Sequence, residues 1–110
     1  MEINDLIAKA YLNANEKGFW SDLDCESLEE VKTQDELNAI GNRLMMIVGE
    51  VGEAQEGLRH NDKANFKEEL ADVAIRLADL CGGLDIDLED EIIKKMDINS
   101  KRQFLHGKAF

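Results

Sequence analysis

Apolar residues recur every three or four positions near the start of the chain, which is the spacing of one face of an α-helix. The stripe consists of Ile3, Leu6, Ile7, Ala10, Tyr11 and Ala14. Gly18 follows, and glycine at this place ends a helix because it readily adopts the left-handed backbone conformation. We therefore predict a first helix from about Ile3 to Lys17, followed by a polar, acidic connection over residues 19–32.

A second, longer stretch of helical spacing begins at residue 33. Thr33 and Glu36 have the spacing of a capping box, in which each side chain bonds the backbone N–H of the other residue. The pattern predicts a helix from there to about Arg59. His60, Asn61 and Asp62 then form a short polar break.

Two more helices complete the pattern. The third spans roughly Ala64 to Cys81, before Gly82 and Gly83, and Asp87 is placed to cap a fourth over about Leu88 to Phe104. The chain contains no proline, and Val and Ile are scattered singly instead of alternating as in a strand. The predicted fold is a single all-α domain, residues 1–110, with four helices.

The second and third helices are expected to form an antiparallel hairpin because the turn between them is short. One arc of the second helix carries Ile40, Leu44, Ile47, Val51, Ala54 and Leu58. One arc of the third carries Phe66, Leu70, Val73, Leu77 and Leu80. We assign the Leu, Val and Met positions to the core. A chain of 110 residues with such wide apolar arcs should also bury one face in a partner, so we expect at least a homodimer.

The composition narrows the class of protein. The formal net charge of −11 argues against a nucleic-acid duplex as partner, because such binding depends on Lys and Arg neutralising phosphates. No run approaches the roughly 20 apolar residues of a membrane span, and the start MEINDLIAKA is unlike a signal peptide. Cys25 and Cys81 lack metal-binding spacing and are interpreted as free thiols in a reducing compartment. We expect a cytoplasmic protein.

Two pairs of acids flank the predicted turn. Glu50 and Glu53 precede it, Glu69 and Asp72 follow it, and each pair lies on the same flank of its apolar arc. In an antiparallel hairpin folded near Asn61 the two pairs come to the same side and the same height.

Four carboxylates at one place repel strongly, since two unit charges 4 Å apart cost about 4 kcal/mol at an effective dielectric near 20. Protons or hard cations must therefore accompany them. All-oxygen ligation suits Mg²⁺, or Mn²⁺, better than zinc or copper. The alternative is that both pairs are solvated faces of acidic helices.

The end of the chain is basic. It carries Lys94, Lys95, Lys101, Arg102 and Lys108 against a single acid, Asp97. Such a tail would suit a small polyanion such as a nucleotide polyphosphate, with Lys95, Asn99 and Arg102 at helical spacing toward the phosphates. The alternative is that these cations only complement the dipole of a helix C-terminus.

Three other side chains are candidates for the site. Arg76 lies one turn after Asp72 and either pairs with that acid, which we prefer, or approaches a phosphate. Phe19 and Trp20 follow the helix-ending glycine. They are either a plug in the core or in an interface, or a surface on which a nucleobase stacks, and Trp20 is retained as a substrate-binding candidate.

The motifs around the acids resemble a known family. EVGE at residues 50–53, followed after a turn by EELAD at 68–72, is similar to the ExxE…ExxD signature of the MazG-like all-α nucleoside triphosphate pyrophosphohydrolases. Three further segments resemble a small single-domain branch of the same superfamily: KGFW, LADLCGGLDIDLEDEIIKKM and the closing N..R…HGKAF.

This resemblance implies hydrolysis of (deoxy)nucleoside triphosphates between the α and β phosphates, with Mg²⁺. It implies that Glu50, Glu53, Glu69 and Asp72 are the metal ligands, and that the four-helix fold dimerises, often into tetramers, with pockets shared between subunits. Since no Ser, Cys or His stands in the cluster as a nucleophile, the general base that acts on the attacking water would be Glu50 or Glu53.

Two alternative functions stay open. A phosphoribosyl-ATP or other nucleotide pyrophosphohydrolase would use the same acids with a different base pocket. A non-enzymatic acidic helical adaptor would not need the four acids at all. The sequence does not choose the nucleobase, the sugar or the number of metal ions.

Overall fold

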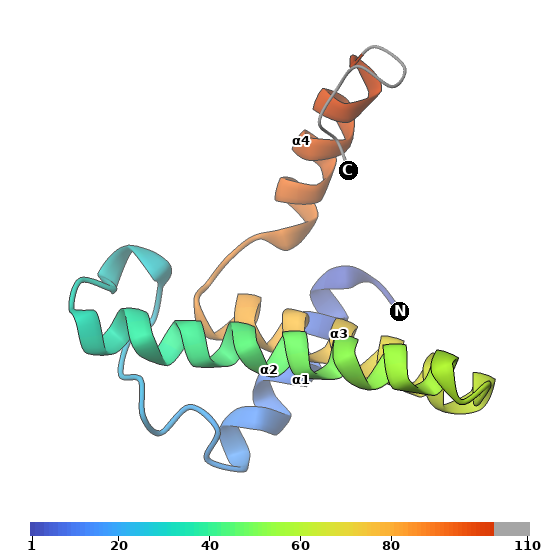
Figure 1. Cartoon of the computed structure of the whole chain (residues 1–110). Helices are drawn as coiled ribbons and strands as arrows, with labels where there is room; N and C mark the ends of the chain where they lie inside the picture. The colour runs from blue at the N-terminus through green and yellow to red at the C-terminus, as the bar shows by residue number, and fades with distance from the viewer. Residues whose placement is uncertain (103–110) are drawn as a thin grey trace.

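The computed structural model describes residues 1–102, and within them the chain is helical without strands. The elements are α1 (Ile3–Glu16), a short 3₁₀ helix η1 (Leu28–Glu30), α2 (Gln34–Arg59), α3 (Lys63–Gly83) and α4 (Leu88–Ser100) (Figure 1). The predicted all-α class is confirmed. None of the helices in this part of the chain is both long and apolar enough to cross a membrane.

The helix ends follow local chemistry. The Thr33 hydroxyl accepts a hydrogen bond from the Glu36 backbone N–H (3.1 Å), and the Glu36 carboxylate accepts one from the Thr33 N–H (2.9 Å), which confirms the capping box of α2. Asp62 and Asp87 cap α3 and α4 through their side-chain oxygens. The turn between α2 and α3 passes through Asn61, whose φ of 54° lies in the left-handed region. Helix α4 ends at Ser100, and the predicted terminus Phe104 lies outside the described residues.

Three of the helices pack together and the fourth does not. Helices α2 and α3 run side by side as an antiparallel hairpin, and α1 packs against α3. Helix α4 extends away from them and has only slight contact with α1 (Figure 1). The four helices therefore do not close into a bundle within the single described chain.

Helix α3 continues through Gly82 and Gly83, whereas the sequence predicted its end before them, at Cys81. A Cβ atom on Gly82 would lie 2.6 Å from Cβ of Tyr11, and one on Gly83 would overlap the Trp20 ring. The glycines are needed because α1 and Trp20 approach α3 closely here. The chain turns two residues later, at Asp85, where φ is 53°.

The core is smaller than the apolar pattern predicted. It is centred on Ala14, Trp20, Leu23, Leu80 and Leu84. The assignment of every Leu, Val and Met to the core is wrong, because many of these side chains are exposed within this chain.

On α2, Ile40 and Ile47 pack against the core, whereas Leu44 and Val51 from the same predicted arc are 49% and 52% exposed. The apolar arc of α2 is wider than its contact with α3. Its outward part, which we call the outer face of α2, consists of Leu37, Leu44, Met45, Val48 and Val51.

Substituting Gly83 by alanine should lower the free energy of unfolding by about 1–3 kcal/mol, because the added methyl group overlaps the Trp20 ring. Gly52, also within a helix, has open space around it, so Gly52→Ala should raise the free energy of unfolding by about 0.5–1 kcal/mol through helix propensity. Urea unfolding followed by circular dichroism measures both. Equal effects at the two positions would contradict the packing role of Gly83.

Candidate functional site

Three carboxylates meet where α2 and α3 lie side by side. One oxygen each from Glu50 of α2 and from Glu69 and Asp72 of α3 lie within 4.8 Å of one another. We call these three residues the acidic cluster. Glu53, the fourth predicted ligand, is exposed and is not part of this group. The antiparallel hairpin thus brings the two acidic pairs to one height, and three of their four members into close range.

Glu69 is the member of the cluster whose surroundings most disfavour a negative charge. Its Oε2 atom is buried and has no hydrogen-bond partner among the described residues. The adjacent Glu50 carboxylate, which can accept a hydrogen bond from protonated Glu69, raises the pKa of Glu69 to about 7, together with desolvation and the charges of Asp72 and Glu53. The cluster therefore favours a proton or a cation at this position.

Arg76 supplies one positive charge beside the cluster. Its Nε donates to Oε1 of Glu50 at 2.8 Å, and the Glu50 side chain is only 18% exposed. This bond holds the pKa of Glu50 below its usual range. The sequence had suggested pairing with Asp72, one turn earlier on the same helix. The partner is instead Glu50, across the hairpin.

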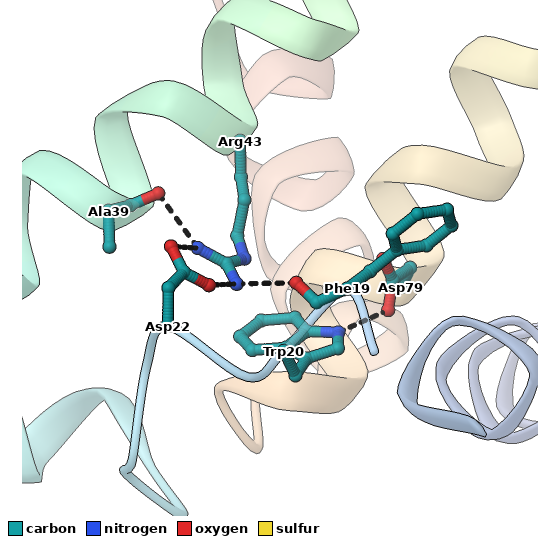
Figure 2. A network of polar contacts seen from close by, with 6 residues as sticks. All are labelled: Phe19, Trp20, Asp22, Ala39, Arg43 and Asp79. Carbon is teal, nitrogen blue, oxygen red and sulfur yellow. Dashed lines mark hydrogen bonds and ion pairs between the residues drawn. The ribbon is translucent and has the colours of Figure 1, made fainter. Parts of the chain in front are cut away.

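Trp20, a predicted substrate-binding residue, lies in the core. It is 7% exposed, its indole N–H donates to Oδ1 of Asp79 at 2.7 Å, and its ring meets that of Tyr11 edge-on with centroids 5.7 Å apart. The guanidinium of Arg43 covers the ring, 4.2 Å from its centroid (Figure 2). Of the two interpretations of this tryptophan, the structure supports the core plug. Phe19 differs, since it is 59% exposed.

Sequence reasoning overlooked Arg43, which fastens the segment after α1 to α2. Its Nη2 donates to the Phe19 carbonyl (2.8 Å) and to Oδ1 of Asp22 (2.6 Å), and its Nη1 donates to the Ala39 carbonyl (3.0 Å) (Figure 2). The bond to Arg43 lowers the pKa of Asp22. The position of Arg43 in the sequence could have indicated this role, because it falls between Ile40 and Ile47 on the side of α2 that packs inward.

Two adjoining pockets flank these side chains. The acidic pocket, about 240 Å³, is bounded by Glu50 and Asp72 of the cluster and by residues of α1. The arginine pocket, about 220 Å³, is bounded by Asp22, Asn42, Arg43, Met46 and Leu80. Phe19, Arg76 and Asp79 line both. The acidic pocket is thus lined by three carboxylates and one guanidinium, whereas Met46 and Leu80 give the arginine pocket a partly apolar lining.

The basic residues of α4 are not brought to this site within the chain. Lys95 and Asn99 are exposed on α4, Arg102 follows it, and no residue of α4 lines either pocket. Lys94 and Lys101 form ion pairs with Asp90 (2.8 Å) and Asp97 (2.9 Å).

These i, i+4 pairs agree with a role of the two lysines in stabilising α4 itself. Lys108 lies outside the described residues.

The raised pKa of Glu69 predicts a pH dependence. Between about pH 4.5 and about 7, the metal-free folded state keeps a proton on Glu69 that the unfolded state releases. The contribution of Glu69 to the free energy of unfolding therefore falls as the pH rises through that window. The free energy of unfolding of wild type, measured in EDTA, should therefore fall relative to Glu69→Gln over this range. Glu68→Gln is the matched control on the neighbouring exposed residue. A difference that stays flat, or equals that of the control, would contradict the assignment.

Comparison with known proteins gives a family match. The model of the MazG nucleotide pyrophosphohydrolase domain matches residues 41–104. Human dCTP pyrophosphatase 1 (Homo sapiens) is 36% identical over 78 residues, covering 59% of this chain and 46% of that protein. The rat (Rattus norvegicus) and mouse (Mus musculus) proteins of the same name are each 35% identical over the same shares. The chain thus matches about half the length of these relatives. No solved structure matches.

The match spans more than half of the chain and includes α3, α4, most of α2 and every member of the acidic cluster. By this match, the chain belongs to the MazG nucleotide pyrophosphohydrolase family.

Proposed function

We propose that the protein hydrolyses a (deoxy)nucleoside triphosphate to the monophosphate and pyrophosphate, with Mg²⁺ or Mn²⁺ as cofactor. The observation that carries this proposal is the acidic cluster, open to a pocket, in a chain of the MazG family. Its free thiols, Cys25 and Cys81, suit a reducing, cytoplasmic compartment.

The residues of the cluster fit a hard divalent cation. Glu50, Glu69 and Asp72 offer only oxygen donors, the set that Mg²⁺ and Mn²⁺ prefer. The buried Oε2 of Glu69 has no other partner among the described residues. Glu53 is close enough for its charge to raise the pKa of Glu69, so it can complete the ligand set. When bound, the cation neutralises negative charge on the reacting phosphates.

The two base candidates differ in their surroundings. Arg76 holds Glu50, which is also one of the three close carboxylates. Glu53 forms no ion pair within residues 1–102 and is the better candidate for general base, accepting the proton of the water that attacks the α phosphorus. The bond between the α phosphorus and the bridging oxygen breaks, and pyrophosphate leaves.

The adjoining pockets suggest how the nucleotide lies. The triphosphate would occupy the acidic pocket, and the base would enter the arginine pocket past the exposed ring of Phe19. The names of the relatives favour dCTP as the first substrate to test. A phosphoribosyl-ATP hydrolase and a non-enzymatic adaptor are the competing functions.

Purified protein should release pyrophosphate from at least one of the eight canonical (d)NTPs, and only with Mg²⁺ or Mn²⁺. Glu69→Gln should reduce the turnover about 100-fold or more, because the cation loses a ligand, while metal-free Glu69→Gln should melt at a higher temperature than wild type because one repelling charge is gone. Glu68→Gln is the control and should retain wild-type turnover. Full turnover in Glu69→Gln would refute the metal site. An absence of turnover in wild type with every (d)NTP would favour the competing functions.

We also propose that the protein works as a homo-oligomer, a dimer or a tetramer. The outer face of α2 is apolar and exposed, and Ile93 and Met96 of α4 are 61% and 66% exposed. Apolar surface of this extent on two helices is typical of an interface. In such an assembly Lys95, Asn99 and Arg102 of one subunit would reach the phosphates at the acidic cluster of another.

Mixing two inactive variants tests the shared site. Glu69→Gln removes a cluster ligand and Lys95→Ala removes a phosphate contact, so each homo-oligomer should have low activity. Oligomers that contain both variants should regain part of the wild-type rate, because one of their sites combines an intact cluster with an intact α4. Sedimentation should show an oligomer at micromolar concentration. An active monomer, or no recovery after exchange of subunits, would refute a shared site.

A further inference from the structure

Arg76 lies at the boundary between the two pockets. Its side chain lines both the acidic pocket and the arginine pocket, and it is 37% exposed. Within residues 1–102, Glu50 is the one residue bonded to it, through Nε at 2.8 Å. Arg43, the other arginine of the arginine pocket, is in contrast committed to Phe19, Asp22 and Ala39 through both of its terminal nitrogens.

The terminal nitrogens of Arg76 are therefore available. Nη1 and Nη2 donate no hydrogen bond to any other residue within 1–102. A guanidinium is planar and rigid, and its terminal N–H groups match the spacing of two phosphate oxygens. Arg76 can thus remain near Glu50 and still present two donors to an anion in the acidic pocket.

The bond to Glu50 also has a cost for metal binding. Glu50 is a member of the acidic cluster, and while it accepts the bond from Arg76 one of its oxygens is engaged with a competing cation. A divalent cation must share or displace that contact. Arg76 therefore weakens metal binding when the site holds no nucleotide.

We propose that Arg76 is a substrate-binding residue that contacts the polyphosphate of the nucleotide and, before the nucleotide arrives, occupies Glu50 in place of the metal. This inference rests on the proposed function. The acidic cluster would then have two states. In one, Arg76 is bonded to Glu50 and the metal is absent; in the other, metal and nucleotide bind together and the terminal nitrogens of Arg76 contact the phosphates.

A purely structural role of Arg76, as a clamp between α2 and α3, predicts a different pattern. Removing a clamp would loosen Glu50 and weaken the metal and the nucleotide together. Removing a competing cation that also binds phosphate should strengthen binding of the metal alone and weaken binding of the nucleotide. The signs of the two effects separate the two roles.

The test compares Arg76→Gln with wild type in two measurements. Binding of Mn²⁺ alone, followed by the electron paramagnetic resonance of the free ion, should become about two- to fivefold tighter, as expected for loss of one partly exposed ion pair. The dissociation constant of an α,β-methylene dNTP, which cannot be cleaved at the proposed bond, should rise about tenfold with Mn²⁺ present, as should KM for the corresponding dNTP. Arg76→Lys keeps the charge without the fork, so its metal affinity should stay near wild type and its KM should be intermediate.

Arg59→Gln is the matched control, because Arg59 also pairs with a glutamate, Glu56 at 2.9 Å, but at the exposed end of the hairpin. It should leave both constants unchanged. Weaker Mn²⁺ binding by Arg76→Gln, or unchanged nucleotide constants, would overturn the inference even if wild type is active. Wild type that binds the analogue but hydrolyses no dNTP would refute the proposed function alone. Wild type that binds no nucleotide would overturn both.

Discussion

The position of the Trp20 indole determines how the site is assembled. The ring fits against α3 because Gly83 has no side chain, its N–H is bonded to Asp79 of the same helix, and Arg43 of α2 covers it (Figure 2). One side chain from the segment after α1 thereby contacts both helices of the hairpin. Phe19, its neighbour, is consequently held at the junction of the two pockets.

The features that depend on nearby residues were predictable from the sequence. The capping box of Thr33 and Glu36, the break at 60–62 and the cap at Asp87 are all formed by residues within four positions of one another. The convergence of Glu50 with Glu69 and Asp72 was also predictable, since it requires only two helical periods and a short turn.

The remaining features depend on contacts between distant residues. Gly82 and Gly83 appeared to end a helix, because their true reason, the approach of Tyr11 and Trp20, is about 60 to 70 residues away in sequence. The apolar arc of α2 combined residues that face α3 with residues that face outward, so its apparent centre was displaced from Ile47 toward Leu44 and Val51. The same displacement made Glu50 and Glu53 look equivalent, although only Glu50 turns inward.

Because α4 has little contact with the other helices, it should unfold locally more readily than they do. A helix of 13 residues is marginal in water by itself, and among residues 1–102 α4 is supported mainly by the Asp87 cap and by i, i+4 ion pairs. Its amide hydrogens should then exchange with solvent through local opening, without unfolding of α1, α2 and α3. We thus expect α4, which carries Lys95 and Asn99, to be less stable than the three packed helices.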